Sequence, residues 1–527
     1  MLNRLPRSSW SLTTAAHLLN RAGFGGTPEH VVSLHKLGCE QAVDAFLDGK
    51  LPFASKQSPP SRPAWFDNQT DPEEKEIKEK LEALRGKRPK ANDLTGEQQA
   101  EQRRNLQRMI RQIINTRSIE LNKWWFETLC TTENPLNEKM TLFWHGHFVS
   151  SLEKVRAPKL MFEQNELFRK MGMGDSRDLT RRMARNPAMV IYLDLNNSRA
   201  EKPNENYARE LLELFTLGEG HYTETDIKEA ARAFTGLRLN RDTHEISFSP
   251  KNHDNGSKTF LGKSGNHGPD DIVKIIFSTD RASEFLSHKL LRYFVIDSPP
   301  DDFVNQLAAE LRRNEFNIRK TLRTLFLSAE FYSKPFLRGR IKSPVEFLVQ
   351  ISRQLELDRI PENLAVRGQS DLGQILFRPP NVAGWPGGKL WINTNTLLNR
   401  YNLAGVLSRG HDDPNYAMKV ISLTGKGMGK GMDKKRNIRN PKMREAIAKR
   451  FPRPDFTTIA PEPLRSDPEK LIASLTFRFF QFPVRQDDHE RFLSFAKSKS
   501  ESENSINDTE LAELIHLMLS TPYYQLT

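Results

Sequence analysis

Two histidines separated by one residue are the first candidates for chemistry in this sequence, and both lie in the phrase FWHGHF. On an α-helix, side chains two residues apart point about 200° away from each other and could not hold the same ion. In an extended segment they point the same way, and Gly146 between them favours an extended backbone at a helix end. We therefore predict that His145 and His147 bind a divalent metal ion together with carboxylates. The alternative is two ordinary histidines in the core or on the surface.

A second group of polar residues lies in the phrase NENYARELLELF, which has the pattern of an amphipathic helix. Asn206, Glu210 and Glu213 fall within about 60° on a helical wheel. Arg209 lies at the margin of this arc, where we expect it to pair with Glu213. One interpretation is a polar wall facing a cleft, with Arg209 and the carboxylates as catalytic groups or metal ligands and with Asn204 and Asn206 binding substrate. The other is an ordinary helix whose charged face lies in water.

Two loops complete the set of candidates. His253 and Asp254 stand in the turn HDNGSK, whose composition exposes side chains, so they are candidates for metal ligands or for proton transfer. Trp385 and Trp391 lie in the loop RPPNVAGWPGGKLW, which its prolines and turns make rigid, and two tryptophans there could stack on a sugar. For both loops a structural role is the alternative: an exposed polar turn in the first case and aromatic anchors of the core in the second.

The elements that must position these residues are almost all helices. Helix-capping residues and glycine stops recur along the chain, and they predict helices over residues 204–217 and 224–235, next to the candidate groups. A capping box at Thr95 and Gln98 begins a long helix that ends near Leu129. The sequence thus predicts a helical scaffold for the polar site.

The predicted fold class is mainly α, a multi-helical single large architecture with a small β-hairpin element within residues 237–260. A chain of 527 residues is long enough to bury a large core. We distinguish six regions: an N-terminal helical segment (1–70), a charged helical hairpin (71–130), a central region with the polar site (131–280), a helical region with the Trp/Pro/Gly loop (281–423), a basic flexible loop (424–450) and a C-terminal helical unit (451–527).

The chain contains one weak internal similarity. The segment LRTLFLSAEFY at residues 322–332 resembles LIHLMLSTPYY at residues 514–524, and a helix with an aromatic pair precedes each of them. This pattern predicts two similar helical units, at about residues 280–335 and 465–527.

The net charge of +13 is concentrated between Lys426 and Arg450, where ten basic residues face two acidic ones. Glycines alternate with lysines at the start of this segment, which predicts a mobile basic loop. Such a loop could bind a polyanion such as nucleic acid, an acidic glycan or a membrane surface. Nucleic acid is disfavoured because the segment lacks aromatic residues for base stacking. The alternative is a solvated insertion with no specific ligand.

The remaining composition bears on the compartment. The chain has only two cysteines, Cys39 and Cys130, which excludes a disulfide framework and a cysteine-based zinc motif. No apolar stretch is long enough for a transmembrane helix, and the first residues lack the apolar run of a signal peptide. We therefore expect a cytoplasmic protein. Export together with a partner protein is the alternative. The oligomeric state does not follow from the sequence.

Six phrases of this chain occur in one order in a known protein family. They are RAGFG, FWHGHF, KPNENYARELLELFTLGEGHYTETDIKEAARAFTG, HDNGSKTFLG, KSPVE and RPPNVAGWPGGKLWINTNTLLNR. Over nearly its whole length the chain resembles the bacterial proteins called domain of unknown function 1800. The resemblance implies no reaction. Genes of the family often lie beside genes for a sulfatase-like protein, and many members carry export signals.

Three hypotheses follow. The first is a metal-supported, hydrolase-like enzyme acting on an ester, a glycoside or a sulfate, with His145 and His147 as ligands and with Glu210, Glu213 and His253 as further ligands or acid–base groups. The second is a non-catalytic scaffold or binding partner of a sulfatase-like protein. The third is a polyanion-binding protein that uses the basic loop. The resemblance strengthens the case for a shared polar site, because the histidines, the NENYARELLELF helix and the HDNGSK turn all belong to its phrases.

Overall fold

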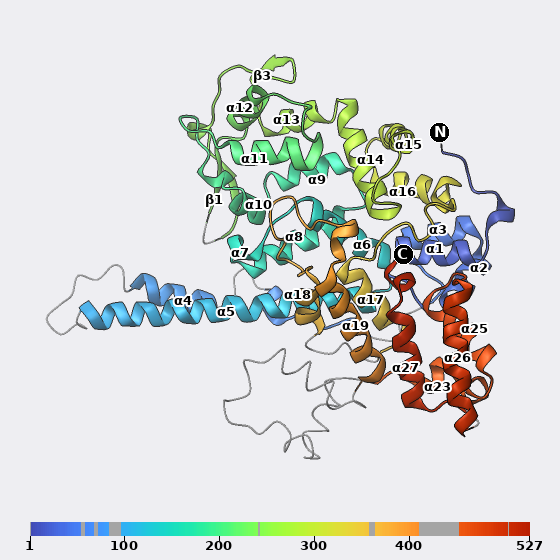
Figure 1. Cartoon of the computed structure of the whole chain (residues 1–527). Helices are drawn as coiled ribbons and strands as arrows, with labels where there is room; N and C mark the ends of the chain where they lie inside the picture. The colour runs from blue at the N-terminus through green and yellow to red at the C-terminus, as the bar shows by residue number, and fades with distance from the viewer. Residues whose placement is uncertain are drawn as a thin grey trace.

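The computed structural model describes residues 2–53, 58–67, 72–83, 96–240, 243–357, 364–410, 453–503 and 505–527 (Figure 1). This part of the chain is mainly helical, and its only strands form two small antiparallel hairpins, so the predicted fold class is confirmed. None of the helices within these ranges carries an apolar stretch long enough to cross a membrane. The predicted basic loop, residues 424–450, lies outside the described residues.

The described residues form helices from one end of the chain to the other. They are α1 (Leu12–Ala22), α2 (Pro28–Leu37), α3 (Cys39–Asp48), α4 (Pro72–Ala83), α5 (Gly96–Thr131), α6 (Pro135–His147), α7 (Leu152–Val155), α8 (Pro158–Met171), α9 (Ser176–Met183), α10 (Pro187–Tyr192), α11 (Glu205–Glu210), α12 (Glu224–Ala233), α13 (Pro269–Ile276), α14 (Asp280–Phe294), α15 (Asp301–Arg313), α16 (Ile318–Leu327), α17 (Pro344–Gln354), α18 (Gln369–Leu372), α19 (Thr394–Arg409), α23 (Phe456–Ile459), α24 (Glu462–Arg465), α25 (Pro468–Phe479), α26 (Gln486–Glu503) and α27 (Asp508–Leu519).

Two hydrophobic cores hold these helices together, and α6 lies between them. The first core is built mainly by α1–α3, α9 and α11–α16, and the second mainly by α5, α7, α17–α19, α23 and α25–α27, while α8 and α10 contribute to both. α6 contributes Phe143 and Trp144 to the first core and Leu142 to the second. Because neighbouring side chains on a helix point in different directions, a helix between two cores buries all of its faces. Accordingly, every side chain of α6 from Glu138 to His145 is buried.

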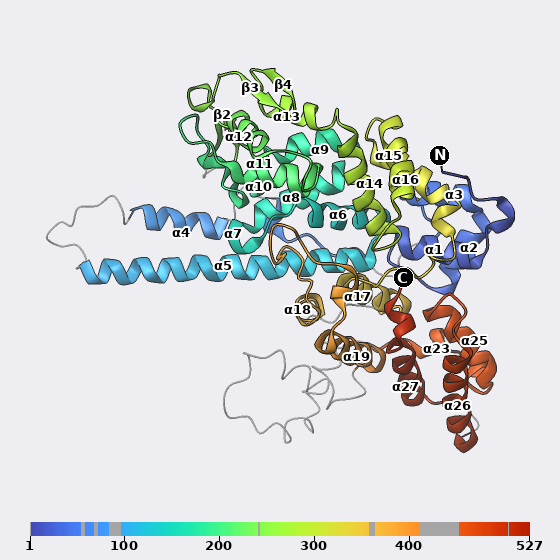
Figure 2. The same cartoon turned by 45° about the horizontal axis from the view of Figure 1, so that its top comes forward.

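α5 is the longest helix, and its first half projects from the body with α4 beside it (Figures 1 and 2). The projecting part is largely charged, and an ion pair of 3.5 Å between Arg117 and Glu73 links the two helices. The last turns of α5 instead bury Leu121, Trp125 and Leu129 in the second core. The charged residues of this region are therefore a solvated surface, as expected from their pattern.

The strands lie in the region where the sequence predicts a hairpin, but they form two hairpins. β1 (Leu237–Leu239) pairs with β2 (Ile246–Phe248), and β3 (Lys258–Phe260) pairs with β4 (Lys263–Gly265). The second hairpin packs on α12, where the amides of Thr259 and Leu261 donate hydrogen bonds to Glu229 and Asp226 (Figure 2).

The two segments that resemble each other in sequence have the same local structure. Residues 322–332 span the end of α16 and a 3₁₀ turn, η6 (Glu330–Tyr332), while residues 514–524 span the end of α27 and another 3₁₀ turn, η10 (Pro522–Gln525). Each helix follows two others, α14 and α15 in the first unit and α25 and α26 in the second. The similarity therefore extends to the order of the elements.

Candidate functional site

The histidines of FWHGHF lie on a helix that does not stop at the glycine. Asn134 caps α6 by accepting a hydrogen bond from the amide of Asn137, and Pro135 occupies the first turn. The helix then runs through Gly146, and the amide of Phe148 still bonds to the carbonyl of Trp144 at 2.8 Å. The prediction of an extended segment is therefore wrong. His145 and His147 point about 200° apart, because they are two positions apart on the helix and each position turns by about 100°.

His145 faces the second core. Its Nε2 accepts a hydrogen bond from the amide of Phe377 at 3.0 Å, so the proton of the neutral ring is on Nδ1. The rings of Trp125, Phe377 and Trp385 surround it with centroids 5.2–5.4 Å away. Burial lowers the pKa of His145 to about 3, so the ring is neutral at physiological pH. His145 thus connects α6 to the Trp/Pro/Gly loop.

His147 faces the first core. Its Nε2 donates a hydrogen bond to the carbonyl of Phe215 at 3.0 Å, and its buried Nδ1 has no hydrogen-bond partner among the described residues. Burial, followed by the charge of Lys289, lowers the pKa of His147 to about 3. Within the described residues, no group of three or more His, Cys, Asp or Glu side chains is arranged to hold a metal ion. Because the two rings face different cores, the positions of His145 and His147 do not fit a shared metal ion.

The NENYARELLELF segment forms α11 and then a π-helical turn, η4 (Leu211–Thr216). The helix predicted over residues 204–217 is thus present, but it changes from α-helical to π-helical hydrogen bonding after Glu210. Asn204 caps α11, and its side-chain amide donates to the carbonyl of Asp194 at 2.9 Å. The side-chain amide of Asn206 donates to the carbonyl of Leu193 at 3.3 Å. Both asparagines, predicted to bind substrate, therefore hold the turn that precedes them.

Glu210 and Glu213 lie at the junction of α11 and η4, and both side chains are half-buried. Burial raises the pKa of Glu210, and the neighbouring Glu213 raises it further, while Arg209 opposes the change. The hydroxyl of Tyr222 donates a hydrogen bond to Glu213 at 3.2 Å, and burial together with Glu213 raises the pKa of Tyr222 to about 12. Among the described residues, neither carboxylate has an ion-pair partner. The pair therefore joins one carboxyl with a raised pKa to one that accepts a phenol hydrogen bond.

Arg209 does not pair with Glu213, contrary to our expectation. Its guanidinium forms two hydrogen bonds of 2.8 Å to the carboxylate of Glu224 at the start of α12, and it lies 3.5 Å from Glu205. A bidentate pair with one carboxylate is stronger than a single ion pair with a residue four positions along the same helix. The Arg209 side chain therefore points toward Glu224 and away from Glu213. This ion pair connects α11 with α12.

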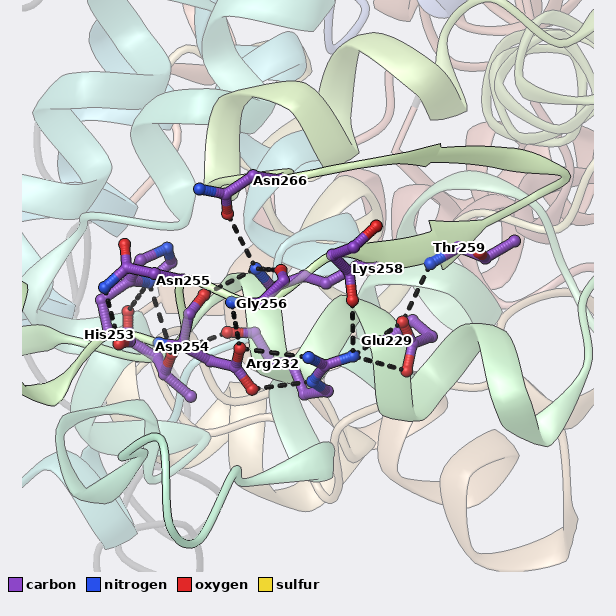
Figure 3. A network of polar contacts seen from close by, with 11 residues as sticks. Glu229, Arg232, His253, Asp254, Asn255, Gly256, Lys258, Thr259 and Asn266 are labelled. Atoms are coloured by element: carbon purple, nitrogen blue, oxygen red, sulfur yellow. Dashed lines mark hydrogen bonds and ion pairs between the residues drawn. The ribbon is translucent and has the colours of Figure 1, made fainter.

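His253 and Asp254 belong to a closed polar network that ties their turn to α12 (Figure 3). Asp254 accepts two hydrogen bonds from Arg232, at 2.7 and 3.1 Å, and this guanidinium lowers the pKa of Asp254. Lys258 is buried and donates to the carbonyls of Asp254 and Gly256 at 2.6 and 3.0 Å. His253 Nδ1 lies 2.9 Å from the carbonyl of Thr235. His253 and Asp254, which were predicted to act as metal ligands or in proton transfer, therefore stabilise the HDNGSK turn.

The two tryptophans of the Trp/Pro/Gly loop have different positions. Trp391 is buried, and Thr396 donates a hydrogen bond to its carbonyl at 3.0 Å, so it anchors the start of α19. Trp385 is half-buried and lies over His145 and Gly146. The loop thus packs directly on the helix that carries the histidines. Two phrases far apart in the sequence meet at this contact.

We expect Gly384→Ala to destabilise the protein more than Gly387→Ala. Both glycines have positive φ, 82° and 77°, so an alanine at either position costs ~1–2 kcal/mol of backbone strain. A Cβ atom at position 384 would also lie 2.8 Å from the carbonyl oxygen of Gly146, whereas at position 387 the nearest atom is a guanidinium nitrogen of Arg292 at 3.9 Å. Denaturant unfolding of the two variants measures the difference. Equal losses would show that the loop can move away from α6 without cost.

The structure contains a buried ionic cluster that the sequence did not predict. Lys139 of α6 is fully buried, and its ammonium group lies 2.9 Å from a carboxylate oxygen of Glu346 in α17. The same group donates hydrogen bonds to the carbonyls of Asn20 and Gly23 at 3.1 and 2.6 Å. Burial lowers the pKa of Lys139 to about 8, and Glu346 limits the fall, so the ammonium is still mostly charged at pH 7. The cluster joins α6, the helix that carries the FWHGHF phrase, to the RAGFG and KSPVE phrases.

Glu346 has a complete set of donors. Arg340 approaches its two oxygens at 3.3 and 3.2 Å, and the amide of Ser343 donates to it at 2.8 Å. The charges of Arg340 and Lys139 hold the pKa of Glu346 well below its ordinary value, although burial acts in the opposite direction. The Ser343–Glu346 spacing is that of a capping box, which signals a helix start but says nothing of the distant Lys139.

Comparison with known proteins identifies the same family that the six phrases indicate. The family described as "Protein of unknown function (DUF1800)" matches residues 17–526. Neither a curated protein nor a solved structure matches the chain significantly. Because the family match covers nearly the whole length, this protein belongs to the DUF1800 family.

Proposed function

We propose that this protein is a hydrolase-like enzyme whose acid–base groups are Glu210 and Glu213. The observation that carries the proposal is the half-buried carboxyl pair at the start of η4, in which burial and then the neighbouring Glu213 raise the pKa of Glu210. Two carboxyl groups in unequal surroundings can divide the roles of acid and base between them. π-helical turns are also frequent at functional sites. Both groups remain partly open to solvent, as a substrate would require.

In the proposed reaction Glu213 acts as the base and Glu210 as the acid. Glu213 takes a proton from a water molecule, the water oxygen forms a bond to the electrophilic atom of an ester, a glycoside or a sulfate ester, and the bond to the leaving oxygen breaks. Glu210 gives its proton to that leaving oxygen. The proton on Glu213 then returns to solvent while Glu210 regains one, so the net change is the consumption of one water. Tyr222 orients Glu213 through its hydrogen bond.

A panel of chromogenic esters, glycosides and sulfate esters, assayed with the purified full chain, tests the proposal. We expect turnover of at least one class by the unchanged protein and its loss in the double variant Glu210→Gln/Glu213→Gln. Turnover that survives in the double variant would assign the activity to other groups. No turnover of any class by the unchanged protein would favour the second candidate.

The second candidate is a binding protein that docks a partner. The observation that favours it is a group of exposed apolar side chains in the 3₁₀ turn before α19 and in the first turns of α19: Leu390, Leu397, Leu398 and Tyr401, with exposed fractions of 71%, 45%, 57% and 49%. Clustered exposed leucines are typical of protein interaction surfaces. The family resemblance suggests a sulfatase-like partner. Co-purification of that partner should fail with Leu398→Glu and persist with Ile119→Glu, which changes an apolar residue of α5 that is 45% exposed.

A further inference from the structure

An apolar groove of about 550 Å³ lies where the start of α1 meets the end of α25 and the segment that leads into α26 (Figure 1). Clefts that bind small molecules have volumes of roughly 300–1,000 Å³ and mostly apolar walls, so the groove has the size of such a site. Its apolar lining consists of Leu12, Ala473, Phe477, Phe482, Pro483 and Val484. None of its lining residues belongs to α11 or η4, so the groove is separate from the Glu210–Glu213 pair.

Gln481 is the most buried residue of the groove lining, with an exposed fraction of 3%. Its side chain accepts a hydrogen bond from the side-chain amide of Asn20 at 2.9 Å and donates one to the carbonyl of Gly26 at 2.7 Å. The backbone of Gln481 has a φ of 58°, a left-handed conformation that residues other than glycine seldom adopt. The two hydrogen bonds hold this turn against the N-terminal helices, so the bottom of the groove is formed by the fold itself.

Two threonine hydroxyls line the groove without a hydrogen-bond partner among the described residues. The Oγ1 atom of Thr476 in α25 is buried, and Thr13 in the first turn of α1 is half-buried. A buried hydroxyl that makes no hydrogen bond is costly, and a hydroxyl or carbonyl group of a ligand would remove that cost. A third polar lining residue, Gln486, already donates to Glu490 at 2.9 Å. The free hydroxyls therefore mark the place for one polar group of a ligand.

The walls of the groove carry no Lys, Arg, Asp or Glu side chain, and His489 is their one titratable residue. The neighbouring Asp488 is buried and lies 3.3 Å from Arg485 of the preceding segment, so its charge is already paired. A charged group that entered the groove would lose hydration and find no fixed charge of opposite sign. The lining thus favours a ligand without net charge.

The extent of the apolar surface favours a small molecule over a protein partner. Leu12 is the one large apolar side chain of the groove that is exposed, at 39%, whereas Phe477, Phe482 and Val484 are half-buried within it. The neighbouring surface of α26 is charged and includes Asp487, Glu490 and Arg491. A stable protein interface needs roughly 20–30 residues on each side, and the apolar surface ends well short of that.

We propose that this groove binds a small neutral amphiphile, an apolar chain or ring system that carries one hydroxyl or carbonyl group. The polar group binds the hydroxyls of Thr476 and Thr13, and the apolar part packs against Phe477, Phe482 and Val484. Because α1 and α25 both line the groove, the bound molecule connects the N-terminal and C-terminal helices.

Fluorescence titration of the full chain with the neutral probe 1-N-phenylnaphthylamine tests the proposal. We expect a saturable rise in probe fluorescence, because the groove removes the probe from water. 1-Decanol should displace the probe at concentrations at which no micelles form. Decanoate and decylammonium have the same chain but carry a charge at pH 7.5, and they should require at least about tenfold higher concentrations, because their head groups must lose hydration.

Two variants and a control locate the binding. Ala473→Glu places a charge in the groove at an exposed helical position and should abolish probe binding without removing a core side chain. Ser494→Glu adds the same charge at an exposed position of α26 outside the groove and should leave binding unchanged. The double variant Thr13→Val/Thr476→Val should weaken the displacement by 1-decanol about 2–10-fold, the effect of losing one net hydrogen bond.

Three results would overturn the proposal. Without saturable fluorescence the groove holds only water. Equal binding by the unchanged protein and Ala473→Glu would place the probe elsewhere, and equal displacement by decanol and its charged analogues would contradict a neutral ligand. Size-exclusion chromatography covers the remaining occupant, since an oligomer that Ala473→Glu dissociates would assign the groove to a second copy of the chain. None of these results depends on turnover by Glu210 and Glu213.

Discussion

The variant Glu346→Gln is expected to lose about 3–5 kcal/mol of the free energy of unfolding, the loss that follows when one partner of a buried ion pair is removed. The carboxylate is 4% exposed and is bound by Lys139, Arg340 and the amide of Ser343. A neutral amide of the same shape leaves both buried cations without their anion and places an NH₂ group against them. Equilibrium unfolding in denaturant, followed by circular dichroism, measures the loss.

The pH dependence of stability gives an independent check on the same residue. The folded-state pKa of Glu346 lies below its ordinary value of 4.5, because Arg340 and Lys139 favour the charged form. The stabilisation from this group is therefore present above pH 4.5 and is lost as the pH falls toward the folded-state pKa. The unchanged protein should lose stability in acid more steeply than Glu346→Gln. Parallel pH profiles would show that Glu346 does not carry its charge in the folded protein.

Glu469→Gln is the matched control. Glu469 also takes part in an ion pair, with Lys497 at 3.4 Å, but its side chain is 73% exposed. Exposed pairs of this kind contribute about 0–1 kcal/mol. A similar loss in both variants would mean that the burial of the cluster around Glu346 is not what makes it important.

The helices could be predicted because their signals are local. The Ser343–Glu346 capping box and the Thr223–Asp226 capping box each lie within one turn of the helix they begin, and both helices start there. The same locality explains the correct placement of the strands within 237–260, although the second hairpin continues to Gly265. Helix boundaries thus follow from neighbouring residues without knowledge of the packing.

The surroundings of the candidate residues could not be predicted in the same way. Whether Gly146 ends α6 depends on packing, and α6 continues because both of its sides are covered by cores. The pairing of Arg209 was decided by Glu224, which belongs to the next helix. Lys139 and Glu346 meet only in the folded chain. Each of these outcomes depends on contacts between elements, which the periodicity of one segment does not contain.

The variant Glu210→Gln is expected to lower the rate of the proposed hydrolysis roughly 10²–10⁴-fold, the range over which a general acid contributes. Glutamine keeps the shape of the side chain but has no acidic proton to give to the leaving oxygen. The rate of the unchanged protein should fall as the pH rises through the raised pKa of Glu210, because the acid is then ionised. That alkaline fall should be absent from the residual rate of Glu210→Gln, and a pH–rate profile of both proteins tests this.

Stability separates a role in chemistry from a role in folding at this position. Because burial and Glu213 raise the folded-state pKa of Glu210, its contribution to stability is full below pH 4.5 and is lost as the pH rises through the folded-state value. Above the folded-state pKa the charged form carries this cost, and glutamine does not, so in that pH range the thermal midpoint of Glu210→Gln should be equal to or higher than that of the unchanged protein. Glu201→Gln, which changes an exposed glutamate just before α11, should alter neither rate nor midpoint.

If Glu210→Gln and Glu201→Gln turn over substrate equally well, Glu210 is not the acid. If the Glu210 variant instead loses both activity and stability, the carboxyl pair supports the fold of η4, and the binding function through the leucines of α19 becomes the better explanation.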